Sequence, residues 1–273
     1  MNIYFSIIIP TLNEEKYLPK LLTSLKNQKE KNFEVIITDG ASSDKTKETT
    51  IVFEKEFPLK FFIHRKKNVS YQRNFGARIA KGSYLVFLDA DTGINTNFTQ
   101  NLRKYIDKFK GLVLIPYIIP DQNDSQSKLI FKIVNFLLEF SQSIGKPFSA
   151  GGNMIWEKHF FQSVGGFNEK LYIAEDHNII QKAYLWGVRP KFLPRIKVKF
   201  SLRRMRREGQ LAYFYKYLLS TAHVLIKGDI KKKIYEYEMG GNVNKVIKKS
   251  LFSKQNFDKY LTQLKNFFGQ YIS

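Results

Sequence analysis

Residues 84–91, YLVFLDAD, join a run of five apolar residues directly to two aspartates one residue apart, Asp89 and Asp91. An apolar run of this length predicts a buried strand. Ligands of parallel α/β sheets bind beyond the carboxyl ends of the strands. Two carboxylates in that place can share a hard divalent cation, Mg²⁺ or Mn²⁺, through oxygen ligands. The alternative is a solvated turn that happens to hold two acids.

The chain around this stretch alternates short apolar runs with amphipathic segments. Such alternation predicts an α/β fold with a mostly parallel, Rossmann-like sheet flanked by helices. We expect strands at residues 4–10, 33–38, 59–63, 84–88 and 112–119, with further strands near Lys191 and Lys197. Helices are predicted at residues 12–28, 71–80, 128–144 and 175–186, and another is capped by Ser43 or Asp44.

Two more polar side chains occupy positions where a ligand would bind. Asp39 ends the strand at residues 33–38, and Gly40 after it lets a ligand approach the backbone closely. Its carboxylate can accept hydrogen bonds from a base or a ribose. Arg73 lies near a helix start, where a guanidinium can bind phosphate oxygens or a base carbonyl. A surface arginine is the simpler alternative.

Several short motifs follow one another in a fixed order: SIIIPTLNE at 6–14, DGASSDKT at 39–46, RNFGARIAKG at 73–82 and FLDADT at 87–92. GGNM at 151–154, VGGFNE at 164–169 and the pair Glu175-Asp176 come later. Over about residues 4–200 this order resembles the family-2 glycosyltransferases. The resemblance implies a GT-A fold, a nucleotide-diphosphate sugar as donor, a divalent cation and inversion at the anomeric carbon.

The same resemblance implies roles on the donor side. The residues that would line the nucleoside pocket are Pro10, Thr11, Asn13 and Glu14. Asp39 would hold the base, and Arg73 would contact the base or the diphosphate. Asp89 would face the ribose or the metal, with Ala90 beside it in the donor site. Asp91 would be the main metal ligand of this DxD motif.

On the acceptor side the resemblance points to Gly151, Gly152 and Asn153 and to the pair Glu175-Asp176, with Asp176 as general base. A carboxylate that takes the proton of an acceptor hydroxyl during attack lowers the barrier to transfer. The competing interpretation is that both acids only complement the N-terminus of a helix.

One departure from the family concerns the region after residue 200. A Gln-x-x-Arg-Trp motif, typical of processive synthases, is absent from the sequence, which argues against processive synthesis. Arg203 and Arg204 stand in that region. They would clamp the diphosphate or a phosphorylated acceptor, or form a basic surface for lipid.

Charge is concentrated at the C-terminal end. The net charge is +21, and residues 201–273 hold 15 basic against 5 acidic residues, or +10. We expect a catalytic domain at 1–200, with a donor half at 1–120 and an acceptor half at 121–200, followed by a basic amphipathic helical extension at 201–273. The apolar segment at 211–226 would lie on an anionic membrane or pack on the domain. The helix at 128–144 would line a lipid-acceptor groove or belong to the core.

These observations predict a transferase of cell-surface glycan biosynthesis. It would be cytoplasmic and peripheral on the inner face of the cell membrane, since there is no cysteine, signal peptide or spanning segment. Its acceptor would be a glycan or a lipid-linked sugar, and the rival within the class is a polyprenyl-phosphate sugar synthase. A basic nucleic-acid- or membrane-binding protein is the alternative of another class. No nucleic acid is expected, because no known nucleic-acid motif is present.

Overall fold

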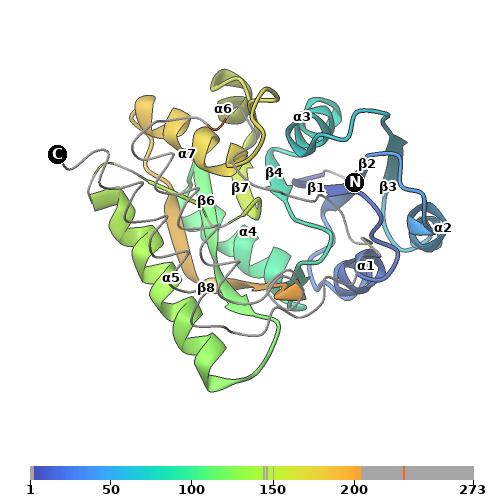
Figure 1. Cartoon of the computed structure of the whole chain (residues 1–273), viewed down its shortest axis with the longest axis horizontal. Coiled ribbons are helices and arrows are strands. Elements are labelled where there is room, and N and C mark those ends of the chain that lie inside the picture. The colour runs from blue at the N-terminus through green and yellow to red at the C-terminus, as the bar shows by residue number, and fades with distance from the viewer. Residues whose placement is uncertain (1–2, 144, 146, 150, 204–229, 231–273) are drawn as a thin grey trace, which may run out of the picture.

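The computed structural model describes residues 3–143, 145, 147–149, 151–203 and 230, and within them one mixed sheet forms the centre of the molecule (Figure 1). Its strand order is β3-β2-β1-β4-β7-β6-β8-β5. The strands are β1 (Phe5–Thr11), β2 (Phe33–Asp39), β3 (Leu59–Ile63), β4 (Tyr84–Phe87), β5 (Gly93–Ile94), β6 (Val113–Pro120), β7 (Met154–Glu157) and β8 (Lys191–Phe200). The helices are α1 (Leu18–Lys26), α2 (Thr46–Ile51), α3 (Val69–Ile79), α4 (Phe98–Phe109), α5 (Ser125–Ser143), α6 (Lys158–Ser163) and α7 (Glu175–Leu185).

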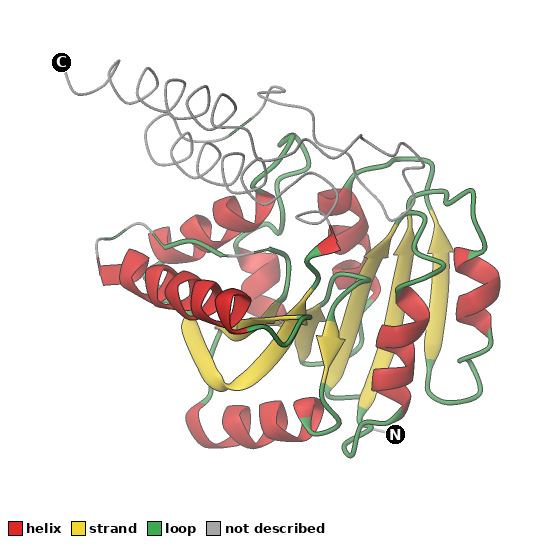
Figure 2. Ribbon diagram, turned by 60° about the horizontal axis from the view of Figure 1, so that its bottom comes forward, coloured by secondary structure: helices red, strands yellow, loops and turns green. Residues whose placement is uncertain are grey.

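Helices cover both faces of this sheet, as Figure 2 shows. Ile7 and Ile9 of β1 pack into one hydrophobic cluster with α1 and α4, while Ile8 packs into a second cluster with α3, α6 and α7. Every residue of β1 and β2 is buried. Two covered faces explain why these strands are apolar without alternation.

The predicted mostly parallel sheet is present in part: β6 and β8 also pair in parallel, but β5 and β7 run antiparallel to the strands they pair with. The order β3-β2-β1-β4 is parallel throughout, but β7 pairs antiparallel with β4 and with β6. The reason is the loop before β7, where Asn153 bonds to Asp89 at the carboxyl end of β4. A strand that starts at that end has to run back along β4.

Two predicted boundaries also need correction. The first helix begins at Leu18 and not at residue 12, because residues 14–17 form a turn in which Tyr17 N–H donates to Glu14 O (3.1 Å). The strands expected near Lys191 and Lys197 are one strand, β8, whose pairing with β6 shifts register between Pro116 and Tyr117.

The basic extension predicted at 201–273 lies outside the described residues, apart from 201–203 and 230. Within the described part of the chain, no helix is both long enough and apolar enough to cross a bilayer.

Candidate active site

The carboxyl ends of β1, β2 and β4 bring the predicted donor-side residues to one edge of the sheet. Thr11 and Asp39, the last residues of β1 and β2, are paired in the parallel register. Asp89 follows β4, the other neighbour of β1. Residues that are separated by up to 78 positions thus share the edge at which α/β sheets bind ligands.

Asp39 is held in one orientation by its neighbours. It is 2% exposed, and its Oδ1 accepts hydrogen bonds from Thr11 Oγ1 (2.8 Å) and Ser42 Oγ (2.5 Å). Its Oδ2 accepts from Ser42 N–H (2.7 Å), because Ala41 adopts a positive φ of 58° and turns the chain back. The side chain is therefore positioned before any ligand arrives.

A second set of bonds joins the loop after β1 to the loop after β2. Asn13 N–H donates to Ser42 Oγ (2.7 Å), and Asn13 Oδ1 accepts from Ser43 N–H (2.8 Å). Asp44 accepts from the N–H of Thr46, the first residue of α2 (3.0 Å), but the N-cap position is Lys45 and not the predicted Ser43 or Asp44. Pro10, Thr11, Asn13 and Glu14 all lie in or directly after the end of β1, where the nucleoside pocket was predicted.

Arg73 connects the predicted donor side of the site with the predicted acceptor side. This residue of α3 is 3% exposed, and its Nη2 lies 2.8 Å from Asp89 Oδ1 while its Nη1 lies 2.8 Å from Glu175 Oε1. Burial alone would lower its pKa, but the carboxylates of Asp89 and Glu175 raise it. Burial raises the pKa of Glu175, Arg73 opposes that rise, and Asp176 adds to it. A direct contact with a base or diphosphate, as predicted for Arg73, would compete with these two ion pairs.

The loop at 151–153 is built around the Arg73 guanidinium. A Cβ atom on Gly152 would lie 1.8 Å from Arg73 Nη2, so only glycine fits there without a shift. Asn153 Oδ1 accepts from Asp89 N–H (3.1 Å) and from Thr92 Oγ1 (2.8 Å). The loop thereby fixes the turn that carries Asp89 and Asp91.

Gly152→Ala should lower the free energy of unfolding by about 3 kcal/mol, because the new methyl group forces the buried guanidinium away from its two partners. Urea denaturation followed by circular dichroism measures this. Gly40→Ala is the matched control, since its methyl group would meet nothing closer than 3.5 Å. Equal stability of the two variants would show that the ion pairs of Arg73 with Asp89 and Glu175 do not depend on the space beside Gly152.

Asp176 lies in the first turn of α7, next to the same loop. Its Oδ2 accepts from Gly151 N–H (2.8 Å), its Oδ1 accepts from His177 N–H (2.9 Å), and the residue is 8% exposed. Ala174, with a positive φ of 64°, turns the chain immediately before the helix. Two backbone donors therefore orient this carboxylate, while the neighbouring Glu175 is bound to Arg73.

Arg203 brings together two further carboxylates, those of Glu14 and Asp91. Its Nη1 and Nη2 bind Glu14 (2.7 and 2.6 Å), and its Nε lies 2.9 Å from Asp91 Oδ2. The guanidinium also lies over the ring of Tyr17, 4.7 Å from the centroid. Arg204, predicted alongside it, lies outside the described residues.

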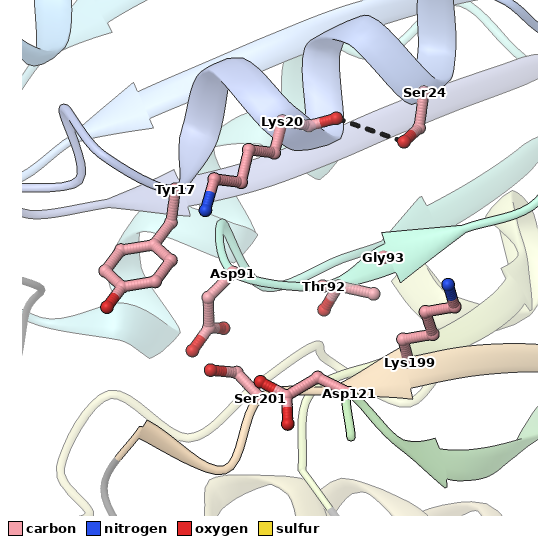
Figure 3. A pocket seen from close by; sticks show the side chains of 9 residues that line it. All are labelled: Tyr17, Lys20, Ser24, Asp91, Thr92, Gly93, Asp121, Lys199 and Ser201. Carbon is pink, nitrogen blue, oxygen red and sulfur yellow. Dashed lines mark hydrogen bonds between the residues drawn. The ribbon is translucent and has the colours of Figure 1, made fainter. Parts of the chain in front are cut away.

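A pocket of about 310 Å³ adjoins Asp91, as Figure 3 shows. The residues that line it are Tyr17, Lys20, Ser24, Asp91, Thr92, Gly93, Asp121, Lys199 and Ser201.

Ala90, which the resemblance places in the donor site, is 4% exposed and packs into the hydrophobic cluster that contains Ile7 and Ile9. The two flanking aspartates are partly exposed, and they pair with Arg73 and Arg203, respectively. Among the described residues, no group of three or more acidic or histidine side chains gathers to hold a metal.

Three residues of this network were missed by sequence reasoning. Ser42 binds Asp39, and Gln72 Nε2 donates to the carbonyl oxygens of Thr11 (2.9 Å) and Thr38. Tyr17 lies under Arg203. Gln72 directly precedes Arg73 and Ser42 stands three positions after Asp39, and this closeness in the sequence was the signal available for them.

Residues 6–165 match the family model described as Glycosyl transferase family 2. The chain belongs to this family. The membership predicted from the sequence motifs is confirmed, and the match includes both the donor-side residues and the loop at 151–153.

Two relatives show how far the likeness extends. Poly(ribitol-phosphate) beta-N-acetylglucosaminyltransferase TarS of Staphylococcus aureus is 24% identical over 244 residues, which covers 84% of this chain and 41% of TarS. A Methanococcus voltae enzyme, dolichyl N-acetyl-alpha-D-glucosaminyl phosphate 3-beta-D-2,3-diacetamido-2,3-dideoxy-beta-D-glucuronosyltransferase, is 28% identical over 196 residues, or 67% of this chain and 58% of that enzyme. The chain therefore spans roughly half the length of these relatives.

Solved structures confirm the glycosyltransferase type of α/β fold. The mannosyltransferase PcManGT of Pyrobaculum calidifontis, solved with GDP-Man and Mn²⁺, superposes with a TM-score of 0.66 at 19% identity, covering 82% of this chain and 64% of that one. Residues 1–349 of S. aureus TarS superpose with a TM-score of 0.62 at 24% identity, covering 80% and 64%. At these identities the likeness shows the fold alone.

Proposed function

We propose that this protein is an inverting glycosyltransferase that moves a sugar from a nucleotide-diphosphate donor to a hydroxyl of a glycan or lipid-linked acceptor. Residues 1–200 are its catalytic domain, with the donor bound by 1–120 and the acceptor by 121–200. Asp176 takes the proton of the attacking hydroxyl, and a divalent cation assists the departure of the nucleotide diphosphate.

The observation that carries this proposal is the bridge made by Arg73. One buried guanidinium binds Asp89, at the donor edge of the sheet, and Glu175, the residue before Asp176. Because Asp176 is itself fixed by two backbone N–H groups, the bridge sets the spacing between donor edge and base. Fixed spacing between reacting groups is a main source of catalysis.

The donor-side carboxylates have the chemistry that a divalent cation needs. Asp91 and Asp89 supply oxygen ligands, which Mg²⁺ and Mn²⁺ prefer, and the diphosphate of the donor would supply others. Such a cation, when bound, stabilises the charge that develops on the leaving diphosphate. Arg203 already neutralises Glu14 and Asp91, and we infer that it turns toward the diphosphate when donor and cation arrive.

The ligands named for the relatives support the donor and acceptor classes. PcManGT was solved with GDP-Man and Mn²⁺, and TarS residues 1–349 were also solved with UDP-GlcNAc. TarS is named for a poly(ribitol-phosphate) acceptor, and the M. voltae enzyme for a dolichyl-linked sugar phosphate. One name gives a polymer and the other a lipid-linked sugar, and we propose that this protein likewise acts in cell-surface glycan biosynthesis, in the cytoplasm at the inner face of the cell membrane.

A donor screen tests the proposal. We expect nucleotide release from one class of UDP-, GDP- or dTDP-sugar, stimulated by Mn²⁺ or Mg²⁺.

Asp39→Ala should raise the KM for that donor about tenfold or more with little change in kcat, because bonds to a distant base stabilise ground and transition states equally. A defect in kcat alone would contradict the role of Asp39 in base binding, and no release from any donor would contradict the proposed function.

A further inference from the structure

Helix α5 has an inner face that is firmly attached to the sheet. Phe131 and Leu138 are buried, and Phe131 contacts the ring of Phe200 in β8. Between them, Asn135 Oδ1 accepts from Ile118 N–H (3.1 Å) and its Nδ2 donates to Ile118 O (2.8 Å). Both polar groups of one β6 residue are thus bound by the helix, which fixes the rotation of α5 about its axis.

The opposite face of α5 is apolar and open to solvent. Five large side chains there are each 50–63% exposed, and they follow helical spacing: Leu129, Ile133, Phe136, Leu137 and Phe140. Phe136 and Phe140 stack on each other with centroids 6.2 Å apart. We call these five residues the α5 stripe. Since one helical residue rises about 1.5 Å, the stripe is about 17 Å long, and Figure 1 shows α5 on the outer flank of the domain, away from β3.

Two lysines border the stripe, and Asp124 lies near the first of them. Lys128 and Lys132 are exposed, and each directly precedes a stripe residue. Glu139 is the only acid of α5, and it accepts a hydrogen bond from Tyr117, whose pKa is raised to about 12 by burial and by this contact. An apolar ridge with lysines beside it is the pattern of helices that lie in a membrane interface.

We propose that the α5 stripe is a membrane-docking surface that enters the headgroup region of an anionic bilayer, with Lys128 and Lys132 at the phosphate groups. A second copy of the chain is disfavoured as the occupant, because each copy carries +21. The same charge attracts an anionic lipid surface. The stripe is also a convex ridge on one helix, which a fluid interface can accommodate.

Docking through α5 would place the acceptor side of the active site close to the membrane. At the end of the helix Ser141 Oγ accepts from Phe148 N–H (3.2 Å), and the chain continues into the loop whose Gly151 binds Asp176. The inference that docking brings a membrane-bound acceptor to the active site rests on the proposed function. The docking itself does not, and it is measured separately.

Because the sequence contains no cysteine, Phe136→Cys offers a single site for an environment-sensitive fluorophore on the full chain. With vesicles of equal parts phosphatidylglycerol and phosphatidylcholine, we expect a blue shift and quenching by nitroxide-labelled lipid. Phe109→Cys, an exposed phenylalanine position of α4 outside the stripe, is the matched control and should show neither. Equal responses at both positions, or none at position 136, would overturn the proposal.

Phe136→Ser combined with Phe140→Ser should weaken vesicle binding on the order of tenfold or more, since two half-exposed rings lose their burial in lipid. Lys128→Gln combined with Lys132→Gln should weaken it about fivefold per lysine at low salt. Phe109→Ser should bind as the unchanged chain does. Donor hydrolysis without vesicles should be equal in all variants, which separates docking from catalysis. If the double serine variant binds vesicles normally, or changes only the oligomeric state, lipid is not the occupant.

Discussion

Asp91→Asn is expected to abolish sugar transfer in a protein that remains folded. The change removes a charged oxygen ligand from the proposed cation, which the leaving diphosphate needs, and a loss on the order of a thousandfold corresponds to about 4 kcal/mol. Folding should be little affected, because asparagine fills the same volume as Asp91, whose side chain is partly exposed and pairs with Arg203. The test is to measure the turnover of the variant and of the unchanged enzyme at saturating donor while Mn²⁺ or Mg²⁺ is added in steps.

Asp107→Asn is the matched control, because Asp107 is an exposed acid of α4 that pairs with Arg103 on the same helix and does not line the pocket beside Asp91. It should keep its activity within about threefold. Arg203→Gln tests whether the activity lost in Asp91→Asn comes instead from the broken ion pair between Asp91 and Arg203. If Arg203→Gln reproduced the whole defect, or if a chelator left the unchanged enzyme active, the assignment of Asp91 to a metal would be wrong.

The fold of the first half could be predicted because its signals are local. The strands β1 and β2 are buried on both faces, so their sequences are rich in Ile, Val and Phe without strict alternation. The second half is harder, since β5 has two residues and β7 only four, too short for a periodicity. Helix α4 was overlooked although Phe98, Leu102 and Ile106 follow helical spacing and are buried.

The sequence predicts which residues lie at the ends of strands but not the contacts that join them. An acid directly after an apolar run marks Asp39, Asp89 and Asp91 as candidate ligands, and the structure puts all three at or after the ends of β2 and β4. Pairing across the chain leaves no local trace: Arg73 and Glu175 are 102 positions apart, and Glu14 and Arg203 are 189 apart. The space for the Arg73 guanidinium depends on Gly152, which a sequence shows only as one glycine of a loop.

Asp176→Asn is expected to slow transfer to a hydroxyl acceptor 10²–10⁴-fold, or about 3 to 5 kcal/mol in the barrier, through loss of the general base. Donor affinity should barely change, since Asp176 contacts the acceptor-side loop through Gly151. A small loss of stability, about 1 kcal/mol, should accompany it. Both carboxylate oxygens accept backbone N–H bonds, and the amide nitrogen of asparagine cannot replace one of them. Single-turnover rates and donor titration separate these effects.

The nature of the acceptor decides how large the loss at Asp176 is. A polyprenyl phosphate is already ionised at neutral pH and needs no base, so a polyprenyl-phosphate sugar synthase would lose much less. With a hydroxyl acceptor, Asp176 has to be ionised, and the acidic limb of the pH–rate profile should disappear in the asparagine variant. We expect this outcome, because the carboxylate beside the Gly151 loop is oriented by two donors while Glu175 is occupied by Arg73. An asparagine variant with unchanged rate and pH dependence on the true acceptor would exclude Asp176 as the base for either acceptor.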